Sequence, residues 1–388
     1  MKTSDAWKTV ALSILVVWVT AICGCAGRYR TAWGDVHGHT ELSDGKGSLD
    51  DYFHHARDVA HLDFAIVTDH DFGHEAPWRM PAADWQLTQS KAEEFTVDGG
   101  FIAIAGYEWT SQEKYWTGVT NQASERLFPG PPSFYNHKIV YFPAAVPYLF
   151  SAKDPSFNNP DLLAEAVRRE GGLIHNAHPD APPQGRDQFD YSPFNSDVIA
   201  NTEMSGDVIR YRGTNYPVLV EQTVRRFLDH GGRTGFVAGS DTHEGKTAAH
   251  TAVLVHDLTR TAILDALRHR RTYAINHARI GLDFRINGHV MGEEVEVNAP
   301  PRICVRVRGT ALIEEITLVR DGVAIEVIHP SRRNVKLAFV DRSFAGSSYY
   351  YVRVIQSDLD EHGNKSCAWS SPIWVHPRRP PPARAHAG

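Results

Sequence analysis

Two histidines separated by one residue follow a short apolar stretch near the start of the chain, in the segment Gly34-Asp35-Val36-His37-Gly38-His39-Thr40. In a β-strand, residues two apart point to the same face. His37 and His39 would therefore direct both imidazoles to one point, as a metal site requires. The pair alone is weak evidence, because 21 histidines among 388 residues give about one such pair by chance.

Further residues of metal-ligand type recur where later apolar runs meet loops. They are Asp44, Asp69, His70, Glu108, His137, His175, His178, Glu203, Asp241 and His243. Several imidazoles and carboxylates around one point repel when charged and cost free energy when buried, and divalent cations resolve both problems. Because these ligands include no thiolate, they suit Zn, Mn or Fe alike. The pattern predicts a metal centre.

The elements that must position these side chains alternate in type from Trp33 to about Ile275. Apolar runs typical of buried strands lie at 64–67, 101–105, 139–142, 173–174, 198–199 and 236–238. Helices are expected at 49–61 (capped by Ser48), 161–170, 217–230 and 260–271. Alternating strands and helices predict an α/β fold with a parallel sheet or barrel, whose active site would lie at the carboxyl ends of the strands.

The pattern changes after about Ile280, where apolar and polar residues alternate. Asn287-Gly288 and Asp321-Gly322 are typical of hairpin turns. We therefore predict a small all-β, sandwich-like domain of roughly 90 residues. The expected division of the chain is a signal peptide with a lipobox-like end at 1–25, an α/β barrel at 26–285, a β-sandwich-like domain at 286–376, and a disordered tail at 377–388.

Composition excludes several classes of protein. A net charge of −6 gives no electrostatic case for binding nucleic acid. Four cysteines without a C-x-x-C motif exclude a zinc ribbon or a disulfide scaffold. Only Cys304 and Cys367 would remain in an exported body, and their pairing is left open.

The N-terminus is typical of an export signal. Lys2 and Lys8 precede an apolar run that has the length of a signal-peptide core and is short for a membrane span. The run ends in Ile22-Cys23-Gly24-Cys25, which resembles a bacterial lipobox except that Ala, Ser or Thr is usual at Cys23. We expect a lipoprotein acylated at Cys25 on the periplasmic face of a bacterial membrane. A soluble periplasmic protein and a plain N-terminal membrane anchor are the alternatives.

Taken together, the motifs resemble the PHP (polymerase and histidinol phosphatase) metallohydrolases, and within them the carbaryl-hydrolase-like branch. The resemblance extends from about Trp33 to Val375. It is carried by His37-Gly38-His39-Thr40, Ser43-Asp44-Gly45, Thr68-Asp69-His70, Gly106-Tyr107-Glu108-Trp109, His178-Pro179, Ser240-Asp241-Thr242-His243 and the segment 368–375. Each motif alone is weak, but their combination in this order is specific.

The resemblance implies a distorted seven-stranded β/α barrel, a (β/α)7 PHP barrel, with a trinuclear metal centre. The first metal would take His37, His39, Glu108 and Asp241, the second Glu108, His137 and His178, and the third Asp44, His70 and His243. A hydroxide would lie between two of the cations. Glu108, Asp241 and His243 would also act in catalysis. Asp69, His175 and Glu203 are expected to support the ligands rather than to bind metal.

The expected activity is metal-dependent hydrolysis of a small, anionic substrate, with two or three divalent ions (Zn, Mn or Fe). Phosphoester cleavage is favoured because paired metals can hold both the attacking and the leaving oxygen. Carbamate, amide or ester hydrolysis at the same centre is the alternative, and a non-catalytic, metal-stabilised surface-binding protein is a third hypothesis. Four cationic residues in loops could bind an anion, namely Arg186, Arg210, Arg212 and Lys246.

Overall fold

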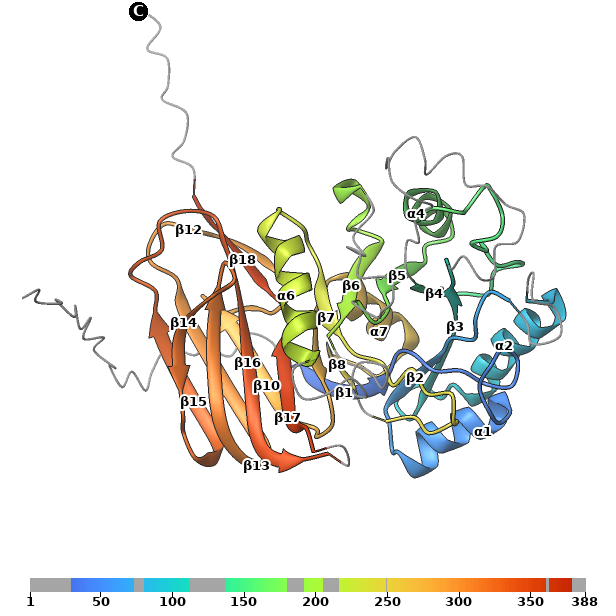
Figure 1. Cartoon of the computed structure of the whole chain (residues 1–388), viewed down its shortest axis with the longest axis horizontal. Helices are drawn as coiled ribbons and strands as arrows, with labels where there is room; N and C mark the ends of the chain where they lie inside the picture. The colour runs from blue at the N-terminus through green and yellow to red at the C-terminus, as the bar shows by residue number, and fades with distance from the viewer. Residues whose placement is uncertain are drawn as a thin grey trace, which may run out of the picture.

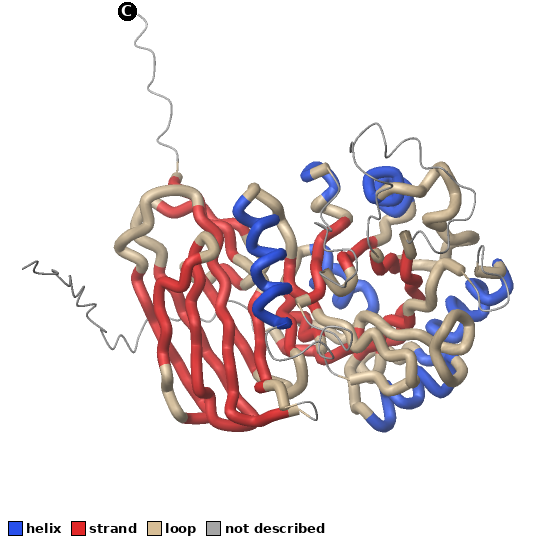
Figure 2. The backbone as a smooth tube through the Cα atoms, viewed as in Figure 1, coloured by secondary structure: helices blue, strands red, loops and turns tan. Residues whose placement is uncertain are grey.

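The computed structural model describes residues 29–72, 80–111, 137–179, 192–204, 216–248, 250–360 and 363–378. The expected signal peptide, most of the expected tail, and Arg186, Arg210 and Arg212 lie outside these residues. The described strands form one continuous sheet with an α/β part and an all-β part (Figures 1 and 2). Within the described ranges, no helix is long and apolar enough to cross a membrane.

The α/β part is a row of short strands. In spatial order they are β7 (Gly235–Val237), β6 (Ile199–Glu203), β5 (Leu173–Asn176), β4 (Lys138–Tyr141), β3 (Ile102–Trp109), β2 (Phe64–Val67), β1 (Arg30–Asp35), β8 (Thr251–Val255) and β9 (Thr272–Ile275). Pairing is parallel from β1 to β3 and from β5 to β7. The expected parallel sheet is thus confirmed only in part, because β4 runs antiparallel to both neighbours and β8 and β9 are antiparallel additions.

The direction of β4 has a consequence for the site. Because β4 is antiparallel, its start lies at the same edge as the ends of β3 and β5. His137, which immediately precedes β4, is therefore brought to the edge where Glu108 and His178 lie. A wholly parallel sheet would place that residue at the opposite edge.

The row of strands is not closed into a barrel, since among the described residues no strand pairing joins its two ends, β7 and β9. The segments that follow β1 and β7 are nevertheless linked by backbone hydrogen bonds. The N–H of His39 donates to the carbonyl of Thr242 at 2.9 Å, and the N–H of Asp241 donates to that of His37 at 3.0 Å. Two of the predicted ligand motifs are thereby fixed to each other.

The helices are α1 (Leu49–His54, continuing as a wider turn at His55–Val59), α2 (Ala82–Phe95), α4 (Pro160–Arg169), α6 (Tyr216–Asp229) and α7 (Arg260–Arg268), with a short 3-10 turn at Pro193–Asn195. Side-chain caps start three of them: Ser48 for α1, Asn159 for α4 and Thr259 for α7. Helix α2 was not predicted from the sequence. It has no side-chain cap and only a weak apolar face, because Leu87 is exposed and Thr88 is buried.

The all-β part follows β9. Its strands are β10 (Gly281–Ile286), β11 (His289–Val290), β12 (Glu294–Val297), β13 (Arg302–Arg320), β14 (Val323–Ile328), β15 (Arg332–Val340), β16 (Ser348–Leu359), β17 (Lys365–Ser370) and β18 (Ile373–Pro377). The long strand β13 pairs with β10 and β15 along one half and with β14 and β16 along the other. Strand pairing crosses the expected boundary at residue 286, because β10 and β11 form a hairpin there.

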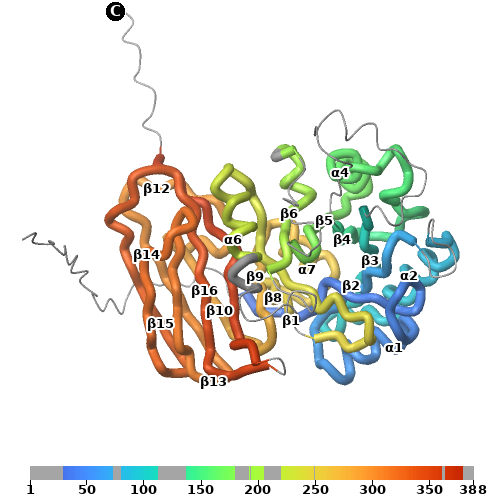
Figure 3. Tube along the Cα trace, in the orientation of Figure 1, coloured from blue at the N-terminus to red at the C-terminus, as the bar shows by residue number. Residues whose placement is uncertain are grey.

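Strand pairing and packed side chains join this sheet to the α/β part. Strand β17 pairs with β9. Helix α6 lies against the same sheet, with Val220, Val224 and Leu228 in one buried cluster with Tyr351 and Trp369 (Figure 3). The two parts are therefore joined by strand pairing and by a common hydrophobic core.

Candidate metal centre

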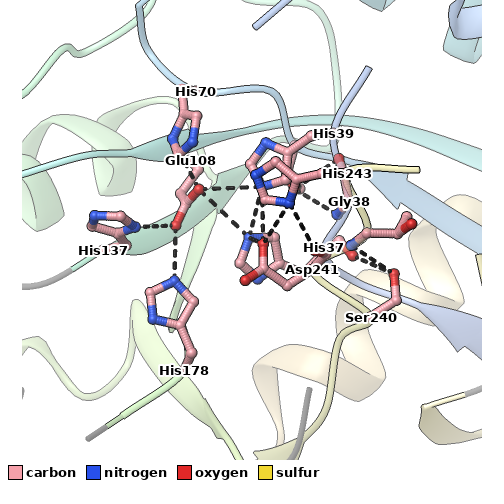
Figure 4. A network of polar contacts seen from close by, with 12 residues as sticks. His37, Gly38, His39, His70, Glu108, His137, His178, Ser240, Asp241 and His243 are labelled. Carbon is pink, nitrogen blue, oxygen red and sulfur yellow. Dashed lines mark hydrogen bonds and ion pairs between the residues drawn. The ribbon is translucent and has the colours of Figure 1, made fainter. Parts of the chain in front are cut away.

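All nine predicted metal ligands meet at one edge of the α/β part. Figure 4 labels all of them except Asp44. They come from the loops after β1, β2, β5 and β7, from β3 and from the residue before β4. Nitrogen–oxygen distances of 2.5 to 3.4 Å link them into one cluster of six imidazoles and three carboxylates. The members are His37, His39, Asp44, His70, Glu108, His137, His178, Asp241 and His243.

Glu108 is the centre of this cluster. Its side chain is only 1% exposed, and imidazoles face both of its oxygens. Oε1 lies 2.5 Å from Nδ1 of His137 and 3.2 Å from Nε2 of His178. Oε2 lies 2.9 Å from Nδ1 of His70 and 3.5 Å from Nε2 of His37. A carboxylate placed in this way can share its two oxygens between neighbouring cations.

Asp241 approaches the two histidines of the first motif. Its Oδ1 lies 3.1 Å from Nε2 of His39 and 3.3 Å from Nε2 of His37. Asp241 has φ 53°, and His178 has φ 26°. Non-glycine residues in this left-handed region are uncommon and cluster at functional sites. The close approach also requires Gly239, because a Cβ there would lie 2.3 Å from the Cβ of His37.

The cluster is open on one side, at Asp44 and His243. Their side chains are 41% and 38% exposed, in contrast to 0% for His37. Oδ1 of Asp44 lies 3.3 Å from Nε2 of His243, 3.4 Å from Nε2 of His70 and 3.8 Å from Nδ1 of His39. The cluster is therefore in contact with solvent on the Asp44 side.

Glu203, predicted as a supporting residue, contacts both buried flanks of the site. Its Oε1 accepts a hydrogen bond from Nδ1 of His37 at 3.0 Å and lies 3.3 Å from Nε2 of His175. Its Oε2 accepts from the backbone N–H of His178 at 2.6 Å. Glu203 thus orients one imidazole directly and fixes the backbone of another, while His175 contacts Glu203 and is absent from the groups of possible ligands found among the described residues.

Asp69, the third predicted supporting residue, holds the loop that carries Asp44. It accepts hydrogen bonds from the backbone and hydroxyl of Thr40, at 2.8 and 2.7 Å, and from the hydroxyl of Ser43 at 2.6 Å. Asp69 is itself buried. It therefore stabilises the loop rather than joining the cluster.

Sequence reasoning assigned no role to two further groups beside the cluster. Buried Asp35 accepts hydrogen bonds from the backbone N–H of Ser240 at 2.9 Å and of His37 at 3.3 Å. Burial raises the pKa of Asp35 to about 6. The Thr110 hydroxyl lies 2.7 Å from Nδ1 of His70. Asp35 could have been noticed in the sequence because it is a charged residue in an otherwise apolar strand. Thr110 has no such distinguishing feature in its local sequence.

The charges within the cluster compensate one another. Burial raises the pKa of Glu108, but His137, His70 and His37 outweigh burial and hold that pKa well below its usual range. Burial likewise raises the pKa of Asp241, yet its histidine neighbours lower it to about 2. The carboxylates are therefore ionised at neutral pH, which is the state that binds cations.

The imidazoles respond unequally to the same surroundings. Burial lowers the pKa of His70, but Glu108 and Asp44 outweigh burial and raise it to about 10. Burial dominates at His137 and lowers its pKa to about 4, although Glu108 opposes the shift. A cation bound among these nitrogens would replace the proton that His70 otherwise carries.

The donor set fits divalent metal ions. Four groups present ligand atoms that all lie within 4.8 Å of one another: His39, Asp44, His70 and His243; His37, His39 and Asp241; His37, Glu108 and His178; and His70, Glu108 and His137. The buried Nδ1 of His39 has no hydrogen-bond partner among the described residues. These buried clusters could hold several ions. The resemblance implies one metal bound by Glu108, His137 and His178 together. In the structure, Glu108 and His178 belong to one group, and Glu108 and His137 to another.

Comparisons with known proteins give three distant relatives. Uncharacterised proteins of Chlamydia trachomatis, Chlamydia muridarum and Chlamydia pneumoniae are 26%, 25% and 24% identical to this chain. The matches cover 88% of this chain but 57% of each relative, so the chain spans little more than half the length of the curated relatives it matches. No family model matches the chain.

Among solved structures, one neighbour is a two-domain protein of Bacteroides vulgatus described as containing a predicted PHP-like metal-dependent phosphoesterase. The match covers 90% of this chain and 95% of the neighbour, with a TM-score of 0.47 and 15% identity. The cluster of imidazoles and carboxylates itself indicates a metal centre.

Proposed function

We propose that this protein is a metal-dependent hydrolase and that phosphoesters are its substrates. The observation that carries the proposal is a cluster of six imidazoles and three carboxylates, buried around Glu108 and open at Asp44 and His243. Buried ligands retain cations, and an open edge admits a substrate. A purely structural metal site would be closed on all sides.

Some residues of the site supply negative charge, and others orient the metal ligands. When bound, divalent cations lower the pKa of a coordinated water to about 7 and balance the charge on attacking and leaving oxygens. Glu108 and Asp241 would supply the negative charge that balances bound cations. Glu203 orients Nδ1 of His37, so that its Nε2 faces the cluster. His243, at the exposed edge, is positioned to contact the substrate.

The arrangement that we propose is trinuclear and of the PHP type, within the carbaryl-hydrolase-like branch. This proposal includes the distorted barrel and the sandwich-like C-terminal domain implied by the resemblance. The nine ligands are those predicted from the sequence. The divalent ions are Zn, Mn or Fe, since imidazole and carboxylate donors accept all three.

A substrate panel tests the activity. The purified protein, loaded with Zn²⁺ or Mn²⁺, is assayed against phosphomonoesters, phosphodiesters, an aryl carbamate and an aryl ester, with metal-loaded Glu108→Gln as the control. We expect phosphoester turnover that depends on Glu108. If the carbamate were cleaved in preference, the proposed activity would be carbamate hydrolysis and not phosphoester hydrolysis. If no substrate were turned over at full metal occupancy, the proposal that the protein is a hydrolase would be refuted.

We also propose that the protein is exported and acylated at Cys25. The lipobox-like Ile22-Cys23-Gly24-Cys25 motivates this proposal. Stable attachment requires more than one acyl chain, because a single chain binds a membrane only marginally. Mass spectrometry of the mature N-terminus should find a lipidated Cys25, and an uncleaved chain or an unmodified N-terminus elsewhere would contradict the proposal.

A further inference from the structure

The two ring nitrogens of His39 belong to different parts of the cluster. Nε2 lies 3.1 Å from Oδ1 of Asp241 and 3.3 Å from Nε2 of His37, on the buried side. Nδ1 faces the open edge, where it lies 3.8 Å from Oδ1 of Asp44. His39 accordingly occurs in two of the four groups of possible metal ligands. The same side chain thus connects the buried and the exposed parts of the site.

The Nδ1 atom of His39 is buried and unpaired within the described part of the chain. The His39 side chain is 0% exposed, and Nδ1 has no hydrogen-bond partner among the described residues. A separation of 3.8 Å from Asp44 is too long for a hydrogen bond. Buried polar atoms are nearly always paired, because leaving one unpaired costs free energy. The ring is also held in place, since the rings of His243 and His70 lie 4.3 and 4.6 Å from it.

His70 provides an internal contrast. It too occurs in two of the groups, and its Nε2 lies 3.4 Å from Asp44. Its Nδ1, however, lies 2.7 Å from the Thr110 hydroxyl and 2.9 Å from Glu108. The Nδ1 atom of His70 is therefore satisfied within the protein, whereas that of His39 is not.

We propose that His39 is a shared ligand that binds one cation through Nε2, beside Asp241, and a second cation through Nδ1, beside Asp44, His70 and His243. This inference rests on the proposed metal centre. Two nitrogen–metal bonds form, the N–H bond of the imidazole breaks, and its proton passes to solvent. The resulting imidazolate carries one negative charge between two cations. Occupancy of the buried and open positions is consequently coupled.

Counting bound Zn²⁺, with no other metal ion present, tests this coupling without an activity assay. Zinc per chain is measured by mass spectrometry in the full-length protein and in His39→Gln, His70→Gln and His243→Gln, after equilibration with buffered Zn²⁺. We expect His39→Gln to lose two ions, and His243→Gln and His70→Gln to lose one each. Loss of a single ion from His39→Gln would overturn the shared-ligand inference.

The wild-type count separates this inference from the proposed function. Three ions in the wild type and a loss of one in His39→Gln would refute the shared ligand but leave the metal centre intact. Fewer than two ions in the wild type would refute the metal centre, and with it both proposals. Circular dichroism establishes that each variant is folded before its zinc is counted.

A measurement on the wild type avoids substitutions altogether. Crystals of the zinc-loaded protein, measured at the zinc absorption edge, would show where each ion lies. The shared-ligand inference requires anomalous peaks about 2.0–2.1 Å from both Nε2 and Nδ1 of His39. A peak at Nε2 alone, with the Nδ1 N–H donating to Asp44, would refute it.

Discussion

The buried and the open sides of the cluster use the same residue types in different surroundings. Around Glu108 the side chains are 0–8% exposed, and each carboxylate oxygen faces imidazoles. At the other side, the side chains of Asp44 and His243 are about two-fifths exposed. Charges interact more strongly when water is excluded. The buried side is therefore suited to retaining cations, and the open side to exchanging ligands.

The largest expected effect is that of Glu108→Gln on hydrolysis. Glutamine keeps the volume of the side chain but removes the charge that would hold neighbouring cations together in the proposed centre. We expect kcat to fall on the order of a thousandfold or more. Asp44→Asn makes the same chemical change on the open side and should cost less, because water compensates there. If Glu108→Gln turned over substrate at a rate near that of the wild type, at full metal occupancy, the proposal that Glu108 is shared between two cations would be wrong.

A methyl group at Gly239 should displace the buried side without changing any ligand. The Cβ of Gly239→Ala would lie 2.3 Å from the Cβ of His37 and 2.7 Å from Oε1 of Glu203. A ligand shifted by about 1 Å can cost roughly a hundredfold in rate. Gly346→Ala is the matched control, because nothing lies within 4 Å of the added methyl there. Equal kcat values for the two variants would show that the close approach is unimportant.

Glu203→Gln tests the support of the buried side. Loss of its charge weakens the contacts to Nδ1 of His37 and the N–H of His178. Removing a residue that orients metal ligands typically costs about 10–100-fold in metal affinity or activity. His175→Gln, one contact further out, should retain most activity and zinc. Zinc titration of both variants checks the order, and a larger loss from His175→Gln would reverse it.

The site could be anticipated from sequence because its ligands lie where apolar runs meet loops. Eight of the nine residues lie at the end of a strand or in the loop that follows, His137 immediately precedes β4, and these strand ends meet at one edge. His137 was the least distinctive of them. Its placement depends on β4 being antiparallel, which a local pattern does not encode.

Features that arise from long-range pairing could not be predicted. Strands β8 and β9 are antiparallel additions, and the link from β9 to β17 joins residues far apart in the chain. Helix α2 lacks both a side-chain cap and a clear apolar face. The two nitrogens of His39 likewise face different groups only because the loops after β2 and β7 converge around that ring.

The metal-free protein should lose stability at both ends of the pH range. The pKa of His70 is raised from 6.5 to about 10, so its contribution is complete below pH 6.5 and is lost as pH rises towards 10. The pKa of His137 is lowered to about 4, so its contribution is present above pH 6.5 and is lost as pH falls to 4. Urea unfolding in chelator should show a flatter alkaline limb for His70→Gln and a flatter acid limb for His137→Gln. Unchanged limbs would contradict these assignments.

The smallest effect on catalysis is expected where α6 meets the all-β sheet, far from the ligands. Buried Glu221 accepts hydrogen bonds from the hydroxyl of Tyr351 at 2.5 Å, from Arg353 at 2.9 Å and from Trp369 at 3.3 Å. Tyr351→Phe removes one donor from a buried carboxylate, which should lower the free energy of unfolding by about 1–3 kcal/mol. Zinc content and kcat should stay unchanged, because no residue of this contact belongs to the cluster.

The matched control for Tyr351→Phe is Tyr349→Phe. The Tyr349 hydroxyl donates to Asp229 at 2.6 Å, but Asp229 is exposed and water can replace the lost donor. Its stability loss should therefore be the smaller of the two in urea denaturation. Equal losses would show that burial does not set the strength of this contact. A loss of zinc from Tyr351→Phe would mean that the sheet supports the metal centre as well as the fold.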